Sequence, residues 1–163
     1  MLTYRKETMP TTPLRAAPIL VALVTLLPWA ADAAAKPFPG PPSGWDHTVA
    51  STPTAEVPRA QETWRKSDGE VISYLADGTA AYDDTVGLVK KNVSDNGLKP
   101  SMDADRTCGG RRAHEVELTL GTSVVHQLIV DDAPGVTKLT YVRPAGSRAA
   151  ADVTSAMSAY CGP

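Results

Sequence analysis

The chain contains only two cysteines among its 163 residues, Cys108 and Cys161, and has no C-x-x-C pair. A structural zinc site uses four ligands with short paired spacings, and redox-active cysteines also lie close together, so neither use is favoured here. The sequence has no G-x-S-x-G motif for a nucleophilic serine and no twelve-residue calcium-binding loop. We therefore predict no cofactor and no catalytic residue of a standard kind.

The chain also lacks an apolar run long enough to cross a membrane. The apolar run at 19–27 is well short of the roughly 20 residues that a spanning helix needs. Basic residues precede it and alanine-rich sequence follows it, as in a secretory signal peptide cleaved near Ala33 or Ala35. We expect residues 1–35 to be this signal, with Met9 as an alternative start. The mature protein would then be secreted or periplasmic and not membrane-spanning.

Neither sign of charge is in large excess. The chain has 16 basic and 18 acidic side chains; residues 1–35 hold three of the former and two of the latter, so the mature net charge is about −3. A nucleic-acid-binding domain needs clustered lysine and arginine for its phosphate contacts, so we exclude that class of partner. The one basic cluster lies around Cys108 and consists of Arg106, Arg111 and Arg112. It is either a candidate anion-binding site or a solvated edge.

The two cysteines have a clear use in an exported protein. An oxidising compartment would pair Cys108 with Cys161 as a disulfide. The closed loop spans 53 positions, for which the chain-entropy model gives a stabilisation of about 4 kcal/mol. Such a bond would fasten the end of the chain to its middle.

Four prolines lie within residues 36–44, a composition that favours an extended linker. A single domain is expected at 45–163, because a mature chain starting at residue 36 has an ordinary length for one domain and can bury a core. Alternating and helical periodicities then predict the elements. They are strands at 45–50, 70–75, 115–120, 123–130 and 136–143, helices at 82–93 and 149–161, and a helical turn or strand at 60–66.

The last helix is amphipathic, because Val153, Ala156 and Tyr160 fall on one face at helical spacing. Ser147 is a candidate N-cap for it. The three consecutive strands before it are joined by short turns, which predicts an antiparallel meander. The sequence therefore predicts an α+β fold, an antiparallel sheet with the helices packed on one of its faces.

The element order resembles that of the PsbP-like α/β/α sandwich, a fold also seen in small bacterial envelope proteins of the DcrB type. The resemblance covers about residues 44–161. It rests on Gly44-Trp45 after the proline-rich lead, the helix at 82–96, Leu139-Thr140-Tyr141 in the last strand, and the C-terminal helix. It implies an accessory or binding role rather than catalysis.

Two small clusters are candidate metal ligands. Asp103 and Asp105 are spaced as in a D-x-D loop, which can hold a divalent cation or supply a nucleophile. His114 and His126 lie in the first two strands of the meander and would approach each other across a hairpin, where paired imidazoles can bind metal. For both clusters the alternative is an ordinary hydrogen-bonded strand position.

Three functions remain open at this point. We favour an exported, non-enzymatic accessory or binding protein that contacts an envelope protein or component through its sheet or its proline-rich arm. A small metal-dependent hydrolase built on Asp103 and Asp105 is the second hypothesis. The third is a module that carries a small ligand in a pocket between helix and sheet.

Overall fold

The computed structural model describes residues 36–41, 43–54 and 58–162. The predicted signal peptide at 1–35 lies outside the described residues. Within the described ranges, no helix has the length and apolar character needed to span a membrane. The elements follow one another in the order β1 (Asp46–Ser51), β2 (Arg59–Arg65), β3 (Val71–Asp77), α1 (Tyr82–Asp95), β4 (Met102–Cys108), β5 (Arg111–Leu120), β6 (Ser123–Asp132), β7 (Gly135–Pro144) and α2 (Ala151–Cys161).

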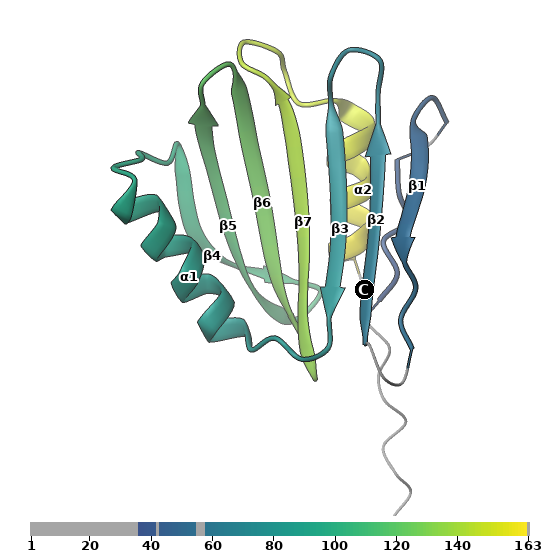
Figure 1. Cartoon of the computed structure of the whole chain (residues 1–163), viewed down its shortest axis with the longest axis vertical. Helices are drawn as coiled ribbons and strands as arrows, with labels where there is room; N and C mark the ends of the chain where they lie inside the picture. The colour runs from purple at the N-terminus through teal and green to yellow at the C-terminus, as the bar shows by residue number, and fades with distance from the viewer. Residues whose placement is uncertain (1–35, 42, 55–57, 163) are drawn as a thin grey trace, which may run out of the picture. The chain divides into compact units, whose positions relative to one another are not determined.

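The strands form one antiparallel sheet in the order β1-β2-β3-β7-β6-β5-β4 (Figure 1). The α+β class is confirmed, and so is the predicted meander, which gains β4 as a fourth strand. The segment at 60–66, for which both a helical turn and a strand were predicted, is strand β2. Pairing of β3 with β7 joins the N-terminal hairpins to the meander, so segments far apart in the sequence share one sheet.

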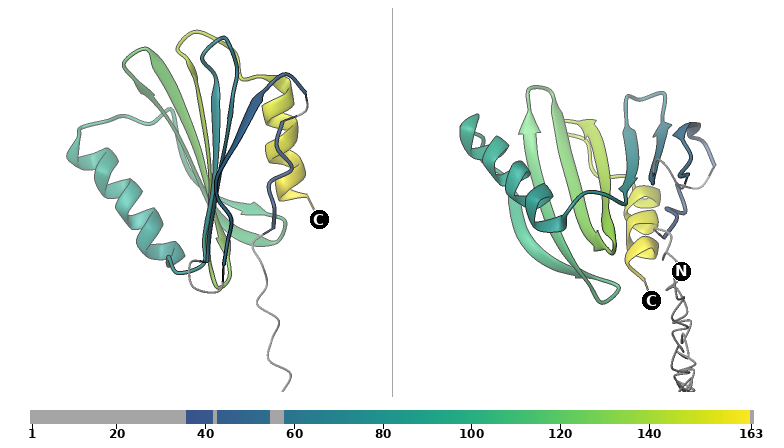
Figure 2. Two further views of the ribbon diagram at one scale, coloured as in Figure 1. Left: turned by 45° about the vertical axis from the view of Figure 1, so that its right-hand side comes forward. Right: turned by 60° about the horizontal axis from the view of Figure 1, so that its bottom comes forward.

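The two helices lie on opposite faces of the sheet, so the prediction that both pack on one face is wrong (Figure 2, left). The composition of β6 gives the physical reason. Its neighbours Leu128 and Ile129 point to opposite faces, and their exposed fractions are 6% and 0%. A strand that is apolar on both sides needs cover on both sides, which one layer of helices cannot supply.

Helix α2 covers the face that carries Leu128, and its own apolar residues complete the core there. Val153, Ala156 and Tyr160 are buried as their spacing predicts. The helix begins after Ala150 and not at Ser147, whose hydroxyl instead donates to the Pro144 carbonyl (2.8 Å). The prediction of Ser147 as the N-cap is therefore wrong.

Part of the proline-rich segment packs into the same core. Phe38 is only 5% exposed, and its ring centroid lies 5.3 Å from that of Trp64 and 6.2 Å from that of Tyr160. Gly40 has a φ of +71° and lies so close to the Trp64 ring that a Cβ would come within 3.1 Å of it. Residues 36–41, which we call the strap, thus belong to the domain instead of forming the spacer that the composition predicts.

The disulfide between Cys108 and Cys161 is present, with a Cα–Cα distance of 4.4 Å. It joins the end of β4 to the last turn of α2. The prediction that the C-terminal helix is bonded to the middle of the chain is confirmed.

Candidate functional site

Three of the four candidate metal ligands lie together on the face covered by α1. The imidazole of His114 is 1% exposed and lies between two carboxylates of the neighbouring strand β4. Its Nδ1 is 2.9 Å from Oδ1 of Asp105, and its Nε2 is 3.2 Å from Oδ1 of Asp103. The hydrogen bond with His114 holds the pKa of Asp105 below its ordinary range.

His126 does not join this group, so the predicted histidine pair is wrong. In the β5–β6 hairpin, His126 lies opposite Glu117, whereas His114 lies opposite Ile129. Positions 114 and 117 differ by an odd number, and the side chains of the two histidines therefore project from opposite faces. Among the described residues, no group of three or more His, Cys, Asp or Glu side chains is arranged to hold a metal ion.

The three arginines around Cys108 do not form one anion site either, because each is paired with a different acidic side chain. Arg106 Nε donates to Glu115 (3.0 Å), Arg111 pairs with Asp132, and Arg112 Nε donates to Asp131 (2.9 Å). Arg112 lies on the α1 face, where its guanidinium stacks over the Tyr82 ring. The predicted basic cluster is therefore a set of separate ion pairs.

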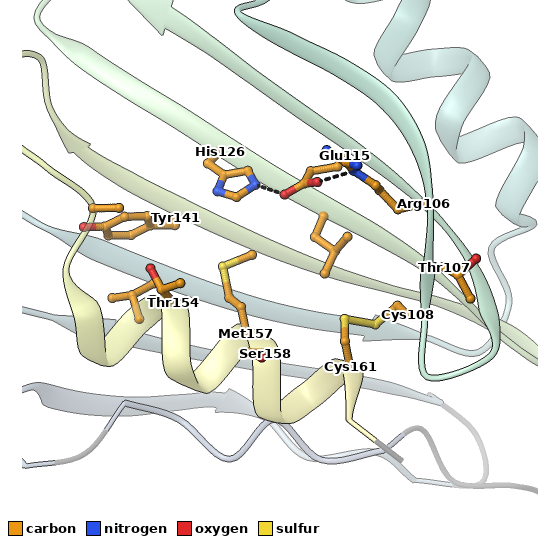
Figure 3. A pocket seen from close by; sticks show the side chains of 13 residues that line it. Arg106, Thr107, Cys108, Glu115, His126, Tyr141, Thr154, Met157, Ser158 and Cys161 are labelled. Carbon is orange, nitrogen blue, oxygen red and sulfur yellow. Dashed lines mark hydrogen bonds and ion pairs between the residues drawn. A yellow bond between two sulfur atoms is a disulfide. The ribbon is translucent and has the colours of Figure 1, made fainter.

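A pocket of about 280 Å³ opens between α2 and the uncovered part of the sheet beside it (Figure 3). It exists because α2 covers one face only in part, and the disulfide holds the end of the helix against β4. The residues that line it come from four strands, the helix and the segment that precedes the helix. They are Arg106, Thr107, Cys108, Glu115, His126, Leu128, Tyr141, Ala149, Val153, Thr154, Met157, Ser158 and Cys161.

The floor and the helical wall of the pocket are mostly apolar. Leu128 and Val153 are buried, and Met157 packs against the core from the helix side. Burial raises the pKa of Tyr141 to about 12, so its hydroxyl stays protonated at neutral pH. That hydroxyl also accepts a hydrogen bond from the backbone amide of Ala150 (3.2 Å), which ties the start of α2 to the sheet.

One end of the pocket is polar. Glu115 on β5 lies between two partners: its Oε1 is 2.7 Å from Nε2 of His126, and its Oε2 accepts from Nε of Arg106 (Figure 3). Side-chain exposures of 20% for Glu115 and 18% for His126 place this contact at the half-buried rim. We call Arg106, Glu115 and His126 the polar triad.

The polar triad contains an oriented imidazole, but the described residues provide it with no nucleophile. Both cysteines are in the disulfide, and no hydroxyl lies within hydrogen-bond distance of His126 in the described ranges. Nucleophilic catalysis needs such a group beside the base. The arrangement can bind and orient a ligand through hydrogen bonds.

From the sequence, Arg106 and His126 were predicted for other roles, and Glu115, Leu128 and Met157 were not predicted as site residues. A signal for their grouping was available. The loop at Gly121 and Thr122 sets the register of the β5–β6 hairpin, and that register places odd-numbered β5 residues on the face of even-numbered β6 residues. No local pattern, however, tells which part of that face α2 leaves open.

No family model matches the chain, and a search of curated proteins gave no match either. The resemblance to PsbP-like proteins, which rests on element order, stays a prediction.

Proposed function

We propose that this protein is an exported, non-enzymatic module that binds a small, mainly apolar molecule in the pocket between α2 and the sheet. The observation that carries the proposal is the pocket itself, an apolar cavity with one localised polar end. Small-molecule sites have this composition, with a few polar groups that orient the ligand. Among the three hypotheses from the sequence, the pocket favours the ligand-carrying module.

The volume limits the size of the ligand. About 280 Å³ corresponds to roughly nine molecules at the ~30 Å³ that a water molecule occupies in the liquid. A ligand with on the order of ten non-hydrogen atoms therefore fits, which is small compared with drug-sized ligands.

The disulfide supports the exported setting of the proposal. Disulfides persist in oxidising compartments and are rare in reducing ones. Here the bond also has a use in the site, because both half-cystines line the pocket and fix one end of its helical wall. A binding module outside the cell would thus keep its pocket shape without a larger core.

The test uses naphthalene as a probe, because its ten carbon atoms match the volume and it has no polar group. We expect the wild-type protein to bind it, with changes in the backbone amide NMR signals of Leu128 and Met157. Ser158→Trp should abolish these changes, because Ser158 is an exposed position that lines the pocket. The indole would fill the space from the helix side.

Ser155→Trp is the matched control. Ser155 lies on the same helix, is also exposed, and does not line the pocket. It should bind naphthalene like the wild type. Equal affinity of the two tryptophan variants, or no binding by the wild type, would contradict the proposal.

A further inference from the structure

The charges at the polar end of the pocket are balanced. Arg106 and Glu115 form one ion pair, with Nε and Oε2 3.0 Å apart. A second pair, Arg143 with Glu117, follows along the same face at 3.5 Å. A neutral imidazole is sufficient for the contact between His126 and Glu115, because its Nε2 can carry the one proton that the contact needs. With a neutral imidazole, the polar end of the pocket holds no unpaired charge to attract an ion.

This balance selects against a charged ligand. An anionic or cationic head group would give up part of its hydration at the half-buried rim and find its opposite charge already paired. An uncharged polar head would lose much less. The apolar floor next to the polar triad requires that the rest of the molecule be hydrocarbon.

The remaining hydrogen-bonding atoms of the polar triad define the head group further. When Nε2 of His126 donates to Glu115, Nδ1 is left with a lone pair and can only accept. Figure 3 shows this second ring nitrogen on the side of α2. Nη1 of Arg106 has no hydrogen bond to another described residue and can only donate. A hydroxyl group can donate to Nδ1 of His126 or accept from Nη1 of Arg106, so either free atom of the polar triad suits it.

We propose that the pocket binds a small amphipathic alcohol, with its hydroxyl at the polar triad and its hydrocarbon body along Leu128, Val153 and Met157. The proposal rests on the proposed function and specifies the chemical class of its ligand. Arg106, Glu115 and His126 are then the residues that determine specificity.

The experiment compares three eight-carbon probes that differ in their head group: 1-octanol, octanoate and octylammonium. Their affinities are measured at pH 7 by NMR titration of the amide signals used for naphthalene. We expect 1-octanol to bind at least tenfold more tightly than either ion. Octanoate or octylammonium binding as tightly as 1-octanol would overturn the inference.

Charge variants separate the effect of the polar triad from the general hydrophobicity of the probes. Glu115→Gln leaves Arg106 unpaired and should shift the preference at least tenfold toward octanoate. Arg106→Gln leaves Glu115 without its guanidinium partner and should shift the preference by a similar factor toward octylammonium. Arg112→Gln, on the opposite face, should keep the wild-type order. An order that stays the same in all variants would overturn the inference.

The two proposals can fail separately. If the wild type binds naphthalene and Ser158→Trp does not, but the three octyl probes bind with equal affinity, the proposed function stands and the alcohol specificity is wrong. If neither naphthalene nor any octyl probe binds, the proposed function itself is wrong.

Discussion

At the scale of single residues, His114 shows how a buried imidazole is accommodated in a sheet. It is 1% exposed and has a carboxylate at each ring nitrogen, Asp105 at Nδ1 and Asp103 at Nε2. Buried polar groups need hydrogen-bond partners. Nδ1 has one in Asp105, whereas Nε2 lies 3.2 Å from the Asp103 carboxylate without forming a hydrogen bond. The D-x-D spacing that resembles a metal or nucleophile loop therefore has a structural use here, because its carboxylates both contact one histidine.

The pKa of Asp105 predicts a pH dependence. It lies below its ordinary value of 3.8, first because of the hydrogen bond with His114. Since the folded state holds this proton less tightly than the unfolded state, the resulting stability is present above pH 4 and is lost as the pH falls through the folded-state pKa. Asp105→Asn should therefore flatten the acid limb of a plot of unfolding free energy against pH below 4. Identical acid limbs in urea titrations of the two proteins would contradict this.

At the scale of elements, the strap explains how a short N-terminal segment becomes part of the core. Phe38 contacts rings from β2, β3 and α2, so one side chain joins three elements. Two hydrogen bonds hold the backbone beside it: the Tyr74 hydroxyl donates to the Lys36 carbonyl (3.2 Å), and Lys36 Nζ donates to the Gly162 carbonyl (3.1 Å). The strap therefore closes the core between α2 and the strands β2 and β3.

Phe38→Ala should lower the free energy of unfolding by about 3 to 5 kcal/mol, the range for truncating a buried aromatic ring. Urea denaturation followed by tryptophan fluorescence measures the change, since Trp64 is in contact with the ring. Leu88→Ala is the control. Leu88 is 60% exposed on α1, so its truncation should change stability by no more than about 0.5 kcal/mol. Similar losses in the two variants would show that the strap is not part of the core.

At the scale of the whole domain, the disulfide connects the two parts of the architecture that the sheet alone does not join. The edge strand β4 and the C-terminal helix meet at Cys108 and Cys161, and Arg111 reinforces the junction by donating to the carbonyls of Cys108 (3.0 Å) and Tyr160 (3.1 Å). Because the bond closes a long loop, it restricts the unfolded chain more than a local cross-link would.

The double variant Cys108→Ser/Cys161→Ser should lose about 4 kcal/mol of unfolding free energy, as the chain-entropy model predicts for this loop. Urea titrations of the variant and of the oxidised wild type provide the comparison, and the wild type measured with a reductant should match the variant. Equal stability of the oxidised and reduced wild type would mean that the bond contributes nothing to the fold.

Much of the fold could be predicted from local pattern. The alternation around Val116 and the helical spacing around Val153 depend only on which neighbours along the chain are apolar, so strands and helices were found near their observed positions. The strap was missed because proline content describes the segment's own backbone preference and says nothing about the aromatic rings that Phe38 meets. The polar triad was missed because its three members come from three different strands.

The sequence by itself determined the α+β class, most element positions and the pairing of the only two cysteines, because each of these follows from composition or from short-range periodicity. Only the tertiary structure decided that His114 and His126 lie on opposite faces, that the helices cover both sides of the sheet, and that a pocket remains beside α2. These features depend on strand register and on which surfaces are left uncovered after packing. Both are properties of segments brought together from distant parts of the chain, and no local pattern specifies them.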